Sequence, residues 1–455
     1  MLKIYLDWNI ITHLKDEQNS DLFTFLLANK NNFIFPYSKA HIKDLLVSKD
    51  ANNKYYKLDL QLLTEICEYH LLEHEQNINN PYPYKCYPED FLNLKGADLE
   101  LLSSGFSKES FYKYLMNNKL NPDDFMSILE KEKIEPFVIP LINKTIGNLA
   151  DLFSIMFEYG PTLFNDKKTP KQIQSYIQAT TDISQYRKIQ GSNSTNVFKE
   201  LDAAVFPQTN KTFVELVENP IAERSKSNLE LFTSLYLTLN LSGFFSDKNR
   251  NLQNIYTDSE HAYYASSCDF FVSNDSRLRE KTDAIYRQYN IQTKIISSDE
   301  LITIMTEELT HSYDIKHMFA RDLPIYGEPI RTEGENNVYK QLPYRFCGLF
   351  NYCINLRIPN ANNITGVFRI VIPPRAYVFY TELERFFELM TNIISEEHKL
   401  LFRKEFVSKF LTKNKDIIDT ATFTIDCPDY LIQLSADKES HIPLPIMFIT
   451  EKVNN

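Results

Sequence analysis

Aspartates that follow two short apolar segments are the residues of this chain best suited to chemistry. Asp7 directly follows a largely apolar segment at the N-terminus, and Asp275 comes shortly after the apolar segment Phe270–Val272. Because the carboxyl ends of parallel strands meet at one edge of a sheet, we expect these two aspartates to converge. Asp258 is expected to open the helix before the second strand and to reach the same place. Clustered carboxylates repel one another unless a cation lies between them, so the pattern predicts bound Mg2+ or Mn2+.

Each acidic residue also has an ordinary structural explanation. Asp7, Asp258 and Asp275 all stand where a helix N-cap or a turn would accept an aspartate. Asp44 is flanked by Ile42 and by two leucines on an expected helix, where a carboxylate is commonly solvated. No single acid is decisive, and only their order along the chain separates the two interpretations.

That order is a strand-terminal aspartate, an acid on the second helix, Asp-x-x-His-Ala-x-x-Ala at 258–265, and Ser-Asn-Asp-x-x-Leu at 273–278. It resembles the PIN domain family, a fold of metal-dependent nucleases that includes bacterial toxin ribonucleases. The resemblance covers roughly residues 1–49 and 255–309. It implies four acidic positions at the carboxyl edge of a parallel sheet, acting as catalytic residues and metal ligands: Asp7, Asp44, Asp258 and Asp275.

The resemblance also implies a mechanism, in which a metal-activated water attacks the phosphodiester and leaves a 5′-phosphate and a 3′-hydroxyl. Ser273 and Asn274 match the small polar residues that precede the fourth acid, and with Lys43 they are the expected substrate-binding residues. For Lys43 the alternative is a solvated helix face. Glu260 is expected to be a solvated acid in the first turn of its helix, and His261 to pack or hydrogen-bond there in place of acting as a general base.

Composition limits the class of protein. The 455 residues are 43% hydrophobic and 24% charged, which is ordinary for a soluble globular protein. A formal charge of -11 means that any attraction for nucleic acid must come from a local patch or a bound metal. Residues 343–415, which have an excess of Lys and Arg, form either such a patch or a mixed solvated face. Six scattered cysteines fit a reducing cytoplasm, and neither a signal sequence nor a membrane span is expected. The sequence contains no glycine-rich nucleotide-binding loop and no zinc-protease or serine-hydrolase motif.

Apolar periodicity predicts an α/β fold, and the resemblance implies a three-layer, PIN-like parallel sheet core. We assign this core to residues 1–49 and 250–309, a helical insertion to 50–249 and an α+β domain to 310–455. In the core, strands are expected at 2–6, 33–35, 270–272 and 293–296. Helices are expected at 10–14 and 22–27. Two further helices are expected to follow an N-cap at Ser38 and a capping box at 297–300, the second of them at 301–309. In the insertion, helices are expected at 58–72, 111–120, 141–159 and 229–245, with a loop at 79–84. In the last domain, strands are expected at 345–358, 366–372, 376–380 and 422–425, with a helix at 382–410.

The sequence thus predicts a metal-dependent endonuclease acting on nucleic acid, with RNA favoured over DNA. Its extra domains would select or gate the substrate, as in a toxin or defence effector held by a regulatory protein partner. Two alternatives stay open: a catalytically inactive PIN-like scaffold that binds nucleic acid or protein, and a metal-dependent phosphatase or nucleotide hydrolase.

Overall fold

Two compact units make up the chain in the computed structural model, and each is described by itself. One covers Lys3–Ile302, and the other covers Met1–Leu2 with Thr303–Asn455. The structure describes residues 2–16, 20–47, 55–74, 80–103, 183–193, 196–205, 212–215, 228–247 and 252–310, seven strands between 328 and 451, and the single residues 171 and 381. No helix among these residues is long and apolar enough to cross a membrane.

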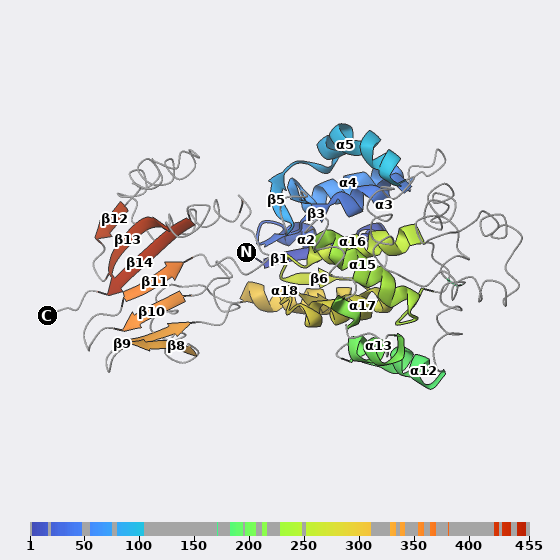
Figure 1. Ribbon diagram of the computed structural model, residues 1–455. Helices are drawn as coiled ribbons and strands as arrows, with labels where there is room; N and C mark the ends of the chain where they lie inside the picture. Colours follow the sequence, from blue (N-terminus) through green and yellow to red (C-terminus); the bar gives the residue numbers. More distant parts are fainter. Residues whose placement is uncertain are drawn as a thin grey trace, which may run out of the picture. The chain divides into compact units, whose positions relative to one another are not determined.

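A four-stranded parallel sheet forms the centre of the first unit, in the order β2-β1-β6-β7. Its strands are β1 (Leu2–Leu6), β2 (Phe33–Ile34), β6 (Phe270–Val272) and β7 (Lys294–Ile296). Ile4 pairs with Phe270 and Leu6 with Val272, and all four side chains are buried. Figure 1 shows β1 and β6 next to each other, although they come from opposite ends of this unit's sequence. The expected α/β class and these four strands are confirmed.

Helices follow the strands of this sheet, and all of them except the helix Ser276–Gln288 were expected from the sequence. They are α1 (Trp8–His13), α2 (Ser20–Asn29), α3 (Lys39–Val47), α16 (Leu252–Ala265), α17 (Ser276–Gln288) and α18 (Ser298–Thr310). Ser38 accepts a hydrogen bond from the Ala40 amide, which confirms it as the cap of α3. Ser297 and Glu300 bond reciprocally, which confirms the capping box of α18.

The start of α16 corrects one expectation. The helix begins at Leu252, so Asp258 lies in its interior and does not open it. The buried side chains of Leu252 and Ile255 extend the apolar face upstream of Asp258, and this burial outweighs the helix-start chemistry of the following residues.

A second small sheet corrects the expected all-helical insertion. It has the order β3-β4-β5, with β3 (Tyr37–Ser38) parallel to β4 (His70–Glu73) and β4 antiparallel to β5 (Tyr82–Lys85). The helix expected over 58–72 ends at Cys67, because Glu68 adopts a φ of 50° and Leu71 then pairs with Tyr37. The segment expected as a loop carries β5. This pairing is long-range, so local periodicity does not reveal it.

The other described helices of this stretch are α4 (Tyr56–Cys67), α5 (Pro88–Ser103), α12 (Ile183–Gly191), α13 (Val197–Val205) and α15 (Asn228–Leu241). Helix α15 confirms the helix expected over 229–245, although it ends four residues earlier, where Gly243 has a φ of 94° and Phe245 a φ of 43°. The helices expected at 111–120 and 141–159 lie outside the described residues.

Seven antiparallel strands form the sheet of the second unit, in the order β12-β13-β14-β11-β10-β9-β8 (Figure 1, orange to red). Their bounds are β8 (Glu328–Glu333), β9 (Asn337–Gln341), β10 (Ile354–Ile358), β11 (Thr365–Arg369), β12 (Phe423–Asp426), β13 (Tyr430–Asp437) and β14 (Leu444–Glu451). Strands β10, β11 and β12 coincide with expected strands, whereas β8, β9, β13 and β14 were not expected. The strand expected at 376–380 and the helix at 382–410 lie outside the described residues.

Candidate functional site

Asp7 lies at the carboxyl end of β1, between the two central strands. Its amide donates to the Val272 carbonyl over 2.9 Å, which extends the β1–β6 pairing by one residue. Its side chain is 2% exposed, and its Oδ2 accepts a hydrogen bond from the Ser273 hydroxyl over 2.9 Å. Burial raises the pKa of the Asp7 carboxyl, the charges of Asp44 and Asp275 raise it further, and His261 and Ser273 act in the opposite direction. Asp7 is therefore a buried acid under repulsion from two other aspartates.

Asp275 lies shortly after β6 and immediately before α17. Its Oδ1 accepts hydrogen bonds from the amides of Arg277 and Leu278, which makes it the N-cap of α17. Its own amide donates to the Ser273 hydroxyl over 3.1 Å. Because that hydroxyl in turn donates to Asp7, Ser273 links the ends of the two strands. Asn274 is exposed and hydrogen-bonds to Ser298 at the start of α18.

His261 joins Asp44 to the interior of the sheet. Its Nε2 lies 2.9 Å from Oδ2 of Asp44, and its Nδ1 lies 2.9 Å from the Tyr5 hydroxyl. Burial lowers the pKa of the His261 imidazole, but the hydrogen bond to Asp44 and the charges of Asp44, Asp7 and Asp258 outweigh burial and raise it above its ordinary value. The expectation that His261 hydrogen-bonds is confirmed, with partners on α3 and β1.

The hydrogen bond from His261 to Tyr5 is part of a buried polar network that also includes Ser38 and His41. The Tyr5 hydroxyl lies 2.7 Å from the Ser38 hydroxyl, and the Ser38 amide donates to Nδ1 of His41. Nε2 of His41 lies 2.8 Å from the Leu6 carbonyl and therefore carries the proton that it donates there. Burial and the nearby His261 lower the pKa of His41, so this second imidazole is neutral.

Glu260 on α16 forms ion pairs with Lys43 and Lys39 on α3, and we call these contacts the α3–α16 clamp. Lys43 Nζ lies 2.6 and 2.8 Å from the two carboxylate oxygens of Glu260, next to the Asp44–His261 pair. Lys39 lies 3.4 Å from Glu260 and is partly exposed. The expected solvated position of Glu260 is wrong, and so is the alternative of a solvated helix face for Lys43, because their exposed fractions are 0% and 6%. Each charge finds its partner on a helix more than 200 residues away, which local sequence does not show.

The charges of the clamp differ in how burial affects them. Burial raises the pKa of the Glu260 carboxyl, but Lys43 and Lys39 outweigh burial and leave this pKa below its ordinary value. Burial lowers the pKa of the Lys43 ammonium, repulsion from Lys39 adds to this, and Glu260 only partly compensates. Two ammonium groups thus stabilise the charged form of Glu260, whereas only one carboxylate stabilises the charged form of Lys43.

The four predicted acids share one neighbourhood. Asp258 is half-buried on α16, three residues before His261, and its charge acts on that imidazole together with Asp44 and Asp7. Asp275 and Asp44 act in turn on Asp7. Carboxylate oxygens of this kind are the donors that Mg2+ and Mn2+ prefer, so the donor chemistry fits such an ion. Among the described residues, no three His, Cys, Asp or Glu side chains stand close enough to hold one metal ion as they are placed.

These features define an α/β protein whose parallel sheet bears an acidic cluster at the carboxyl ends of its two central strands. Comparison with protein-family models, with curated proteins and with solved structures gives no match for this chain.

Proposed function

We propose that this protein is a metal-dependent endonuclease with a three-layer, PIN-like core, and that RNA is its substrate. The proposal is supported by the electrostatic coupling of the four acids near the carboxyl ends of β1 and β6: Asp44 and Asp275 act on Asp7, and Asp7, Asp44 and Asp258 act on His261. These acids come from four separate segments of the chain. Packing alone does not require four acids there, because a buried aspartate under repulsion, such as Asp7, destabilises the fold.

The chain's own groups would hold and orient the reacting centre. When bound by these carboxylates, a Mg2+ or Mn2+ ion supplies Lewis acidity and lowers the pKa of a coordinated water. Ser273 fixes the Asp7 carboxylate through one oxygen and fixes the loop that carries Asp275 through its amide. The Nε2–H group of His261 orients Asp44. No side-chain nucleophile is needed, so the products are expected to carry a 5′-phosphate and a 3′-hydroxyl.

The test is cleavage of end-labelled single-stranded RNA and DNA by the full chain with Mg2+, Mn2+ or EDTA. The informative variant is Asp275→Asn, because asparagine caps a helix as well as aspartate does but removes the charge. The matched control is Asp283→Asn on the same helix, whose partner is Arg287. We expect metal-dependent RNA cleavage by the wild type and the control and its loss in Asp275→Asn. Equal cleavage by all three proteins would refute the proposal.

An inactive scaffold is the second candidate, and one observation favours it. Oδ2 of Asp44 already accepts a hydrogen bond from His261, which occupies one of the oxygens that the proposed ion would need. This candidate predicts no cleavage with either metal and unchanged nucleic-acid or protein binding after the aspartates are neutralised. Hydrolysis of small phosphate esters without polynucleotide cleavage would instead indicate a phosphatase or nucleotide hydrolase.

The proposed biological role is that of a cytoplasmic toxin or defence effector, in which the 50–249 insertion and the 310–455 domain select the substrate or restrain the core. A regulatory protein partner would act on the same restraint. Expression of the full chain and of Asp275→Asn in cells tests this role. Unrestricted RNA degradation by the full chain alone would argue against restraint.

A further inference from the structure

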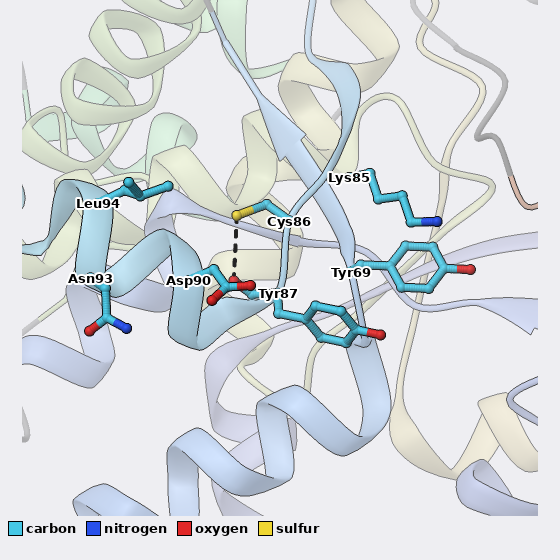
Figure 2. Close-up of a pocket in the computed structure, with 7 residues that line it drawn as sticks. All are labelled: Tyr69, Lys85, Cys86, Tyr87, Asp90, Asn93 and Leu94. Atoms are coloured by element: carbon cyan, nitrogen blue, oxygen red, sulfur yellow. Dashed lines mark hydrogen bonds between the residues drawn. The ribbon is translucent and has the colours of Figure 1, made fainter.

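A pocket lies on the small sheet of the first unit, among residues of β5, α5 and the turn before β4. It is an open depression with a volume of about 560 Å³, and five of its seven lining residues are exposed. Figure 2 shows Tyr69, Lys85 and Tyr87 on one side of the view, and Asp90, Asn93 and Leu94 arriving from α5 on the other. None of these residues belongs to the acidic cluster.

Aromatic rings and one ammonium group dominate the first side. The ring centroids of Tyr69 and Tyr87 are 5.6 Å apart with an interplanar angle of 79°. Lys85 Nζ lies 4.4 Å from the centroid of the Tyr69 ring. Lys85 therefore covers Tyr69, whereas Tyr87 is 45% exposed and presents a ring on which a flat ligand can stack.

The backbone around the pocket is fixed before any ligand binds. The buried Tyr37 donates its hydroxyl proton to the Cys86 carbonyl over 2.7 Å, and the Cys86 amide donates to the Tyr69 carbonyl over 3.1 Å. Such preorganisation lowers the entropy lost on binding. Burial raises the pKa of the Cys86 thiol, and Asp90 and Glu73 add to the shift, so this cysteine is a protonated wall residue and no nucleophile.

We propose that this pocket binds one nucleotide of a single-stranded RNA, with the base stacked on Tyr87, the base edge bonded by Asp90 and Asn93, and the phosphate paired with Lys85. A stacking ring, an amide, a carboxylate and one cation together match the parts of a nucleotide. The lining carries one positive and one negative side chain, which suits a single base and phosphate better than a long phosphate backbone. The choice of RNA as the source of the nucleotide rests on the proposed nuclease function.

The experiment measures binding without cleavage. A short fluorescein-labelled single-stranded RNA is titrated with the full chain in EDTA and followed by fluorescence anisotropy. Loss of one stacked base in Tyr87→Ala should weaken binding about 5- to 140-fold. Tyr55→Ala is the matched control, because Tyr55 is 43% exposed and also lies under a lysine, with Lys15 Nζ 4.6 Å from its ring. The control should bind as the wild type does, and circular dichroism should show that both variants fold.

Salt dependence tests the single phosphate contact. Loss of one contact in Lys85→Ala should reduce the slope of log affinity against log salt by about 0.7. Adenosine monophosphate should compete with RNA for the wild type and not for Tyr87→Ala. Binding of adenosine monophosphate without binding of RNA would overturn RNA as the source.

The two proposals fail separately. If Tyr87→Ala binds RNA as tightly as the wild type while Asp275→Asn abolishes cleavage, the pocket inference is refuted and the nuclease stands. If RNA binding requires Tyr87 but no metal supports cleavage, the nuclease is refuted and the nucleotide pocket stands.

Discussion

Replacing Lys43 with methionine should be among the most destabilising single changes in the first unit. The substitution keeps most of the apolar stem but leaves Glu260 with 0% exposure and without the ammonium group 2.6 Å away. Removing one partner of a buried ion pair typically costs about 3 to 5 kcal/mol. Lys39 remains 3.4 Å from Glu260, so we expect the loss to lie near the lower end, at about 3 kcal/mol. The companion change Lys39→Met removes a partly exposed charge and should cost about 1 kcal/mol or less.

The double substitution Lys43→Met with Glu260→Met distinguishes pairing from packing. It removes both buried charges, so it should recover most of the stability that Lys43→Met loses. Urea denaturation followed by the fluorescence of Trp8, the single tryptophan, reports the unfolding of this unit without signal from the other. The midpoint at an unchanged slope gives the free energy of unfolding. A loss below about 1 kcal/mol in Lys43→Met, or a double variant no more stable than the single one, would refute the argument.

Three further predictions follow from the same side chains. The pKa of the Glu260 carboxyl is lowered in the folded state, so the folded state binds fewer protons at this group than the unfolded state does. The resulting stabilisation is present above the ordinary pKa of 4.5 and is lost as the pH falls. When the free energy of unfolding is measured against pH, the Lys43→Met, Glu260→Met double variant should therefore lose less stability in acid than the wild type. The pKa of Asp7 is raised, so ionisation of this carboxyl destabilises the folded state at neutral pH, which is the opposite of the effect of Glu260. Asp7→Asn should therefore raise the melting temperature and abolish cleavage. Mg2+ should raise the melting temperature of the wild type and not that of Asp7→Asn. His261→Leu should raise the Mn2+ concentration needed for half-maximal cleavage about 10- to 100-fold, whereas His261→Gln, which keeps a donor for Asp44, should stay nearer the wild type; equal behaviour of the two variants would show that His261 does not orient Asp44.

The core strands and the helix caps could be predicted because each depends on residues that are close together along the chain. The apolar runs at 2–6 and 270–272 are buried on both faces of a parallel sheet, where hydrophobic residues occur without alternation. Ser38, Asp275 and Ser297 cap helices through hydrogen bonds within three residues. Strand β4 was missed because Leu71 becomes a strand residue by pairing with Tyr37, a partner distant in sequence. Strand β5 was missed because the prolines at 81 and 83 are typical of a loop.

The acidic cluster followed from sequence only in part. Asp7 and Asp275 were placed together by the rule that the ends of parallel strands converge, and this part of the site needed no side-chain detail. The mirrored spacings His41-x-x-Asp44 and Asp258-x-x-His261 were the available signal for the histidines, because residues three apart share one face of a helix.

Tertiary structure decided which charges are paired. Glu260 and Lys43 carry every sequence sign of solvated helix residues, yet packing of α16 on α3 buries both. The same packing turns His261 toward Asp44 and Tyr5. The four strands of the parallel sheet and the helix caps could be predicted because they depend on neighbours along the chain. The burial and partners of each charge depend on helices more than 200 residues apart, and only their packing sets the electrostatics of the site.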